Sequence, residues 1–247
     1  MTGVGSGTAD AGATGHPSVG LVVFDLDGVL VDTQYAEDGG LARLGRRMGL
    51  TLDDERASAL FSGKRLATCI ELLETLSGRP APQDAVAFVR AECERILGPR
   101  IDPVEGAEEA LRRITVTKCV ASNSPRHLIE RRLEASGLLD YFEDRLCSAY
   151  DTNVWKPDPG LFLSAAAAHR VPPSKCVVVE DSEVGVRAGV RAGMRVLQFT
   201  NGRPGAAHSD GVTTFTHLSQ LPDLIRRQAV PARSQLPEER GPECGKS

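Results

Sequence analysis

Short apolar runs alternate with helical patterns along most of the chain. Four runs are largely aliphatic or β-branched and are bounded by polar residues or glycine: residues 19–24, 116–121, 175–179 and 195–199. Runs of this kind are typical of strands that are buried on both faces. Helical periodicity follows at three places: residues 125–135, 159–168 and 183–192. The alternation predicts an α/β fold with a Rossmann-like, doubly wound parallel sheet that helices cover on both faces.

The stretch between the first two predicted strands breaks this alternation. From about Gln34 to Ile101 it shows only helical periodicity, as at Leu66, Ile70 and Leu73. It directly follows the end of a strand, which is where ligand sites form in α/β folds. We therefore predict an inserted α-helical cap domain, although these helices could instead complete the main core.

The resulting organisation has a core, a cap and two tails. The core comprises residues 19–34 and 102–229, and the cap comprises residues 35–101. Residues 1–18 are mostly small, and residues 230–247 carry Pro and mixed charge. Because neither tail has enough apolar surface to offset its chain entropy, we predict a flexible leader and a disordered tail.

Composition narrows the function classes. The net charge of −4 provides no electrostatic footprint for nucleic acid or for an acidic membrane surface. Neither a signal peptide nor an apolar run of membrane-spanning length is visible, and the six cysteines are scattered without a metal-binding or disulfide pattern. We expect a cytoplasmic protein, favoured as a monomer, whose partner is a small molecule and not nucleic acid or membrane.

The first apolar run ends in two carboxylates separated by one residue. Asp25 and Asp27 are followed by Gly28, and because Asp and Gly are poor strand residues, the strand should end at Asp25. Two nearby carboxylates at a strand end are most simply explained by a divalent cation or by distinct catalytic roles. Taken alone, the motif fits a turn or a calcium loop equally well.

Three further polar clusters occur beside predicted strand ends. Ser122 and Asn123 end the second run before a helix, where a hydroxyl and backbone N–H groups can bind phosphate or merely cap the helix. Lys156 lies in a Pro-flanked loop, although most lysines are simply solvated. Glu180 and Asp181 end the third run, where Asp181 could be only a helix cap. Because strand ends converge on one crevice in a parallel sheet, we interpret all four clusters as one site.

In order and spacing, these segments resemble the four motifs of the haloacid dehalogenase-like hydrolase superfamily. The segment from Glu180 through Met194 is similar to the last motif of its phosphatase and phosphomutase branch. The resemblance spans roughly residues 19–226, and the helical insertion matches the small α-helical cap of this superfamily.

The resemblance implies a phosphatase that works through an aspartyl-phosphate intermediate. Asp25 would be the nucleophile, and Asp27 would protonate the leaving oxygen and then activate water. Ser122 and the N–H of Asn123 would hold phosphate oxygens, and Lys156 would offset charge on Asp25 and the phosphate. The substrate would be a small phosphorylated metabolite.

The same resemblance implies a magnesium cofactor. Mg²⁺ would be held by Asp25, by the backbone carbonyl of Asp27 and by Asp181, and Glu180 would orient a metal-bound water. Gly28 would allow the sharp turn of the chain beside the metal and the substrate.

Departures from neighbouring subgroups refine the expected reaction. Asp27 disfavours the dehalogenases and the phosphonate-cleaving members, which lack an aspartate at that position. Glu37 occupies the position of a histidine in β-phosphoglucomutases, which weakens the mutase alternative without excluding it. Residues 150–151, 155–159 and 213–222 resemble bacterial sugar-acid phosphatases that act on 6-phosphogluconate.

Substrate choice is expected to lie in the cap. Lys64 and Arg65 lie in a basic turn between helical stretches and could meet the carboxylate of a sugar acid, or be solvated. An alternative of another class is a non-catalytic binding module on this fold. Such a module would be expected to have lost at least one of the motif residues, all of which are present.

Overall fold

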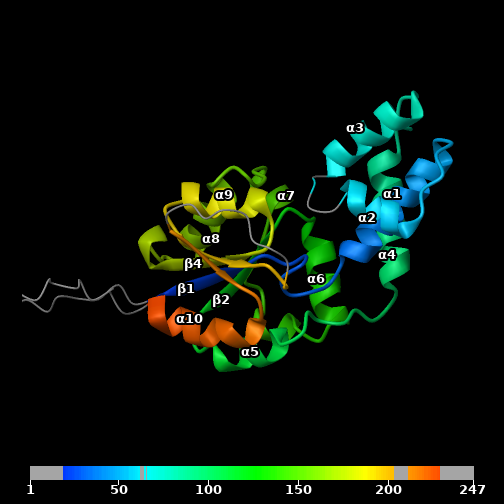
Figure 1. Cartoon of the computed structure of the whole chain (residues 1–247). Helices are drawn as coiled ribbons and strands as arrows, with labels where there is room; N and C mark the ends of the chain where they lie inside the picture. Colours follow the sequence, from blue (N-terminus) through cyan, green and yellow to red (C-terminus); the bar gives the residue numbers. More distant parts are fainter. Residues whose placement is uncertain (1–18, 62–63, 65, 203–210, 229–247) are drawn as a thin grey trace, which may run out of the picture.

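The core of the molecule is a six-stranded, fully parallel sheet with strand order β3-β2-β1-β4-β5-β6 (Figure 1). The structure, a computed structural model, describes residues 19–61, 64, 66–202 and 211–228; the predicted leader and tail lie outside these residues. The strands are β1 (Leu21–Phe24), β2 (Lys118–Ser122), β3 (Leu146–Ser148), β4 (Cys176–Glu180), β5 (Arg195–Phe199) and β6 (Val212–Phe215). The predicted α/β fold with a doubly wound parallel sheet is confirmed.

Helices cover both faces of this sheet because successive strand side chains point to opposite faces. Val22 and Phe24 of β1 belong to one apolar cluster, and Leu21 and Val23 belong to another. The first face carries α5 (Ala107–Arg113), α6 (Arg126–Ala135) and α10 (Leu221–Gln228). The opposite face carries α8 (Gly160–Ala168) and α9 (Glu183–Arg191) (Figure 1). The remaining short elements are α7 (Ala149–Thr152) and the 3₁₀ turns η1 (Leu139–Tyr141), η2 (Pro173–Lys175) and η3 (Leu218–Gln220).

Four helices form a separate body at one side of the sheet (Figure 1). They are α1 (Gln34–Arg47), α2 (Asp54–Phe61), α3 (Leu66–Ser77) and α4 (Ala85–Leu97), and they share their own apolar cluster. Helix α1 approaches α4 so closely that a Cβ on Gly40 would lie 2.9 Å from the carbonyl oxygen of Val89. Apart from Gln34, these helices fall within residues 35–101, which the sequence assigns to a cap, and we refer to them as the cap. Among the described residues, no helix combines the length and apolar character of a membrane span.

The sheet order places three strand ends side by side. β1 lies between β2 and β4, and Phe24 is in register with both Val120 and Val179. The chain therefore fills one half of the sheet before it crosses to the other, and β1 lies at the topological switch point. As a consequence, the residues that follow β1, β2 and β4 lie side by side where the carboxyl ends of the strands meet. This edge of the sheet faces the cap.

Candidate active site

The loop after β1 presents two carboxylates at this edge. The N–H of Asp25 donates to the Val179 carbonyl at 2.9 Å, so Asp25 is held against β4 at the strand end. Gly28 has a φ of +83°, and a Cβ there would lie 2.3 Å from Asp181 Oδ2. Only glycine therefore fits this turn without displacing Asp181. The turn brings the Asp27 side chain to the same edge as Asp25.

Lys156 reaches this edge from the loop before α8. Its Nζ donates to Asp25 Oδ1 at 2.5 Å and to Glu180 Oε1 at 2.7 Å, and its side chain is 2% exposed. Asn123 fixes the loop, because its Oδ1 accepts the backbone N–H of Lys156 at 2.9 Å. Glu180 also accepts the N–H and the hydroxyl of Ser182, both at 2.9 Å. The lysine thus forms ion pairs with both the carboxylate that follows β1 and the carboxylate that ends β4.

Burial and mutual repulsion perturb the charges of these groups. Burial raises the pKa of Asp25 to about 8; the charge of Lys156 opposes this rise, while Glu180 and Asp27 add to it. The pKa of Asp181 is raised well above its usual value, first by burial and then by Glu180 and Asp25. Burial acts to lower the pKa of Lys156, but Asp25 and Glu180 outweigh it and raise that pKa, so the lysine stays cationic. Lys156 alone therefore does not compensate the negative charge of the acidic groups at this edge.

A divalent cation fits this imbalance. Asp25, Glu180 and Asp181 can each present one carboxylate oxygen such that all three oxygens lie within 4.8 Å of one another. Hard cations such as Mg²⁺ prefer carboxylate oxygens, and an added positive charge would relieve the repulsion that raises the pKa of Asp25 and Asp181. The donor set present therefore suits the cofactor that the sequence predicts.

The end of β2 supplies groups suited to bind an oxyanion. Ser122 is the last residue of β2 and is 2% exposed, and Asn123 and Ser124 lead into α6. The Ser122 hydroxyl oxygen accepts the N–H of Ser124 at 3.0 Å, which leaves its proton available to a ligand. Ten residues of helix follow, so the N-terminal end of α6 adds a favourable dipole. Hydroxyl and amide groups thus lie beside the carboxylates of β1 and β4.

A cavity of about 800 Å³ joins this edge to the cap. It is lined by motif residues of the core and by cap residues that include Lys64, which is exposed. Arg65, which the sequence also nominates, lies outside the described residues. Arg90 of α4 lines the same cavity and contacts Tyr150 of α7 both by a hydrogen bond and through the ring face, 5.1 Å from its centroid. The cap therefore contributes cationic side chains to the cavity wall.

The structure also adds partners to Asp27 that the motif analysis missed. Its Oδ1 accepts Thr33 Oγ1 at 2.9 Å and Arg132 Nη1 at 2.5 Å, and its Oδ2 accepts Ser124 Oγ at 3.2 Å. Thr33 and Ser124 are the last residues of the first and second motif segments, so the sequence contains their hydroxyls even though it assigns them no role. Arg132 lies in the last turn of α6, where its spacing carries no such signal.

Glu37 of α1 is a further carboxyl beside this cluster. Burial raises its pKa to about 7, assisted by Asp27 and opposed by Arg132. An acid with a raised folded-state pKa destabilises the fold progressively as pH rises from its unfolded value, 4.5, to about 7. Glu37→Gln, which is neutral and of equal size, is therefore expected to be more stable than the wild type at pH 8 by about 2 kcal/mol, at 1.36 kcal/mol per pKa unit with allowance for relaxation. The difference should be small at pH 5 and vanish only as pH falls below the unfolded pKa of 4.5.

Urea unfolding of the two proteins between pH 5 and pH 8.5 measures this difference. Glu55→Gln, which alters an exposed side chain of the neighbouring helix α2, serves as the matched control and should show no pH-dependent gain. A Glu37→Gln difference that stays constant across this range would show that Glu37 is not held protonated in the fold.

Comparison with known proteins agrees with this geometry. The family model for haloacid dehalogenase-like hydrolases matches residues 19–193. The chain is 38% identical to the 6-phosphogluconate phosphatase of Escherichia coli K12, over 82% of this chain and 93% of the relative. It is 32% identical to hexitol phosphatase B of the same organism, over 71% and 81%. A solved haloacid dehalogenase-like protein of Agrobacterium tumefaciens superposes with a TM-score of 0.74 at 30% identity, covering 86% of this chain and all of that one.

Proposed function

The chain belongs to the haloacid dehalogenase-like hydrolases, and we propose that it is a magnesium-dependent phosphatase that hydrolyses a sugar-acid phosphate through an aspartyl-phosphate intermediate. At the coarser level it is a phosphoric monoester hydrolase of the sugar phosphatase type. The observation that carries the finer proposal is the Asp25–Lys156–Glu180 arrangement, in which a buried carboxylate and a fixed cation meet at the switch point of the sheet.

In the proposed mechanism, Asp25 supplies the nucleophile. A carboxylate oxygen of Asp25 attacks phosphorus, the bond from phosphorus to the leaving oxygen breaks, and Asp27 gives that oxygen its proton. The acyl phosphate on Asp25 is then attacked at phosphorus by a water whose proton passes to Asp27. Inorganic phosphate leaves, and both aspartates return to their starting states.

Neighbouring groups bind the phosphate and offset its charge. Ser122 and the N–H of Asn123 would bind phosphate oxygens, and Lys156 would offset the negative charge of both Asp25 and the phosphate. Mg²⁺, held by Asp25, Asp181 and the backbone carbonyl of Asp27, with Glu180 behind it, would neutralise charge so that a carboxylate can approach an anionic phosphate. Gly28 keeps this turn free of a side chain.

The proposed substrate class rests on the cap and on the relatives. A sugar acid carries a carboxylate besides its phosphate, and the exposed Lys64 lines the cavity where that carboxylate would lie. Arg65, the next residue in the sequence, is proposed as its partner. The relative with 38% identity over most of both chains is a 6-phosphogluconate phosphatase, which supports 6-phosphogluconate as the proposed substrate.

The test is phosphate release from a panel of sugar phosphates, sugar-acid phosphates, phosphoglycolate and nucleotides. We expect the highest kcat/KM with sugar-acid phosphates in the presence of Mg²⁺, and at least about a hundredfold loss when EDTA removes the metal. A preference for another class would replace the proposed substrate but keep the mechanism. Conversion of β-glucose 1-phosphate to glucose 6-phosphate without phosphate release would contradict the phosphatase proposal in favour of a mutase.

A further inference from the structure

Arg132 joins the catalytic edge of the core to the cap. It lies on α6 and is 3% exposed. Its Nη1 donates to Asp27 Oδ1 at 2.5 Å, while its Nε and Nη2 donate to Glu94 Oε1 at 3.1 and 2.9 Å. Glu94 belongs to α4 of the cap. One planar guanidinium therefore connects a core carboxylate and a cap carboxylate with fixed geometry.

This connection fixes the orientation of the Asp27 carboxyl group. The terminal torsion of an aspartate is broad, so the carboxyl group rotates readily unless its oxygens are held. Here Oδ1 accepts both Arg132 and Thr33, and Oδ2 accepts Ser124. Arg132 is the charged donor among these, and charge-assisted hydrogen bonds are roughly twice as strong as neutral ones. Loss of Arg132 would therefore loosen the group that must meet the leaving oxygen.

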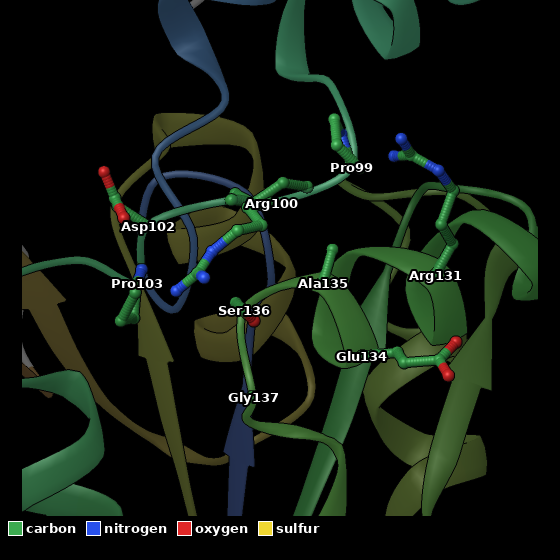
Figure 2. A pocket seen from close by; sticks show the side chains of 10 residues that line it. Pro99, Arg100, Asp102, Pro103, Arg131, Glu134, Ala135, Ser136 and Gly137 are labelled. Carbon is green, nitrogen blue, oxygen red and sulfur yellow. The ribbon is translucent and has the colours of Figure 1, made fainter.

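A second arginine provides a comparison on the same helix. Arg131 donates to the other oxygen of Glu94 and to the Gly98 carbonyl, at 2.7 Å for the latter. Figure 2 shows the end of the Arg131 side chain beside Pro99, and both residues line a cavity of about 570 Å³ between the chain segment that leaves the cap and the end of α6. Arg131 thus contacts the same cap carboxylate as Arg132, but its second hydrogen bond goes to the Gly98 carbonyl and not to Asp27.

We infer that Arg132 is a positioning residue for proton transfer: it orients Asp27 toward the leaving oxygen and, through Glu94, makes that orientation depend on the cap. The inference rests on the proposed function, because it assigns Arg132 a part in the same reaction. In that step the Asp25 oxygen–phosphorus bond forms, the bond from phosphorus to the leaving oxygen breaks, and the proton of Asp27 moves to the leaving oxygen.

Such a role has a signature that a purely structural ion pair lacks. A poor leaving group needs its proton in the transition state, whereas an acidic phenol leaves readily without one. Misplacement of Asp27 should therefore slow phenyl phosphate much more than p-nitrophenyl phosphate, although the two substrates have similar shapes. The informative constant is kcat/KM, because it includes the first phosphoryl transfer and excludes the later hydrolysis that both substrates share.

The experiment compares Arg132→Met with Arg131→Met on both aryl phosphates at saturating Mg²⁺. Since general acid catalysis contributes typically 10²–10⁴-fold, we expect Arg132→Met to lower kcat/KM for phenyl phosphate by about 10–100-fold and for p-nitrophenyl phosphate by less than about threefold. Arg131→Met should change both substrates by the same small factor. Equal losses on both substrates in Arg132→Met would overturn the inference and leave Arg132 a structural residue.

Two checks keep this outcome interpretable. Arg132→Met leaves Asp27 and Glu94 without their buried arginine, which could destabilise the fold. Glu94→Gln is therefore the second variant: it retains the contact between Arg132 and Asp27 but weakens the contact between Arg132 and the cap. We expect the same selective loss on phenyl phosphate, about 3–10-fold, from weaker orientation of the acid. Equal losses on both substrates in Glu94→Gln would contradict the dependence on the cap. Absence of phosphate release by the wild type from either compound would instead contradict the proposed function itself, and the inference with it.

Discussion

Asp25→Asn is expected to abolish phosphate release from every substrate, with kcat reduced by at least about a thousandfold, because an amide cannot replace the carboxylate that attacks phosphorus. Asparagine has nearly the same size and keeps an oxygen within reach of Lys156, whose Nζ lies 2.5 Å from Asp25 Oδ1 in the wild type. The loss therefore reports the chemistry of the nucleophile. Steady-state phosphate release with Mg²⁺ present measures it.

Covalent trapping separates the nucleophile from the acid. After an acid quench of the reaction with ³²P-labelled substrate, the wild type should retain label that hydroxylamine releases, as an acyl phosphate does. Asp27→Asn should also retain label with an activated aryl phosphate, because its defect lies in proton transfer. Asp25→Asn should retain none, and retained label in Asp25→Asn would assign the nucleophile to another residue.

Stability measurements test whether unfolding could cause the loss of activity in Asp25→Asn. Burial raises the folded-state pKa of Asp25 from 3.8 to about 8, so without metal this residue destabilises the fold increasingly as pH rises between those values. A neutral asparagine removes that penalty. Asp25→Asn is therefore expected to melt at or above the wild-type temperature at pH 8.5, in the absence of Mg²⁺.

Much of the sheet could be predicted because its strands are buried on both faces. Continuous apolar runs mark β1, β2, β4 and β5, all of which the sequence predicts. The two outermost strands escaped prediction for physical reasons. β3 has only three residues, too few to show a period. β6 is the outermost strand on the other side and has two adjacent threonines between Val212 and Phe215, so it shows neither a continuous apolar run nor an alternation.

The predicted site residues come together because strand topology fixes their convergence. Asp25, Ser122 and Glu180 each occupy or follow the end of a strand, and parallel register alone brings them side by side. The contact between Arg132 and Glu94 could not be inferred in this way. It joins two residues that lie 38 positions apart in the sequence and on different helices. The packing of the cap on the core, which no local period encodes, brings them together.

Lys156→Met is expected to cause the largest loss of stability together with a loss of activity on the order of a thousandfold, as removal of a buried charge-stabilising donor does. The lysine is 2% exposed and separates Asp25 from Glu180, with Asp181 adjacent. Removing one partner of a buried ion pair costs about 3–5 kcal/mol, because the remaining charges lose their compensation. Urea unfolding at pH 8.5 without metal should show a loss of this size.

The stability cost of Lys156→Met should depend on both pH and Mg²⁺. As pH falls to 6, Asp25, whose pKa burial raises to about 8, takes up a proton, so the cost of losing Lys156 should shrink. Mg²⁺ should also reduce the cost, since it supplies positive charge to the same carboxylates. The pH effect and the metal effect should therefore overlap, with Mg²⁺ restoring less stability at pH 6 than at pH 8.5.

Lys118→Met is the matched control for this variant. Lys118 is also partly buried, but within the described residues its ammonium group donates to a single acceptor, the Ile114 carbonyl, at 2.6 Å. It lies at the start of β2, at the opposite end of that strand from Ser122. Its loss should cost about 1 kcal/mol, the usual worth of one hydrogen bond, and leave kcat/KM unchanged. If Lys156→Met were no less stable than Lys118→Met at pH 8.5, the carboxylates around Lys156 would already be neutral, and the charge imbalance that favours a divalent cation at this edge would be absent.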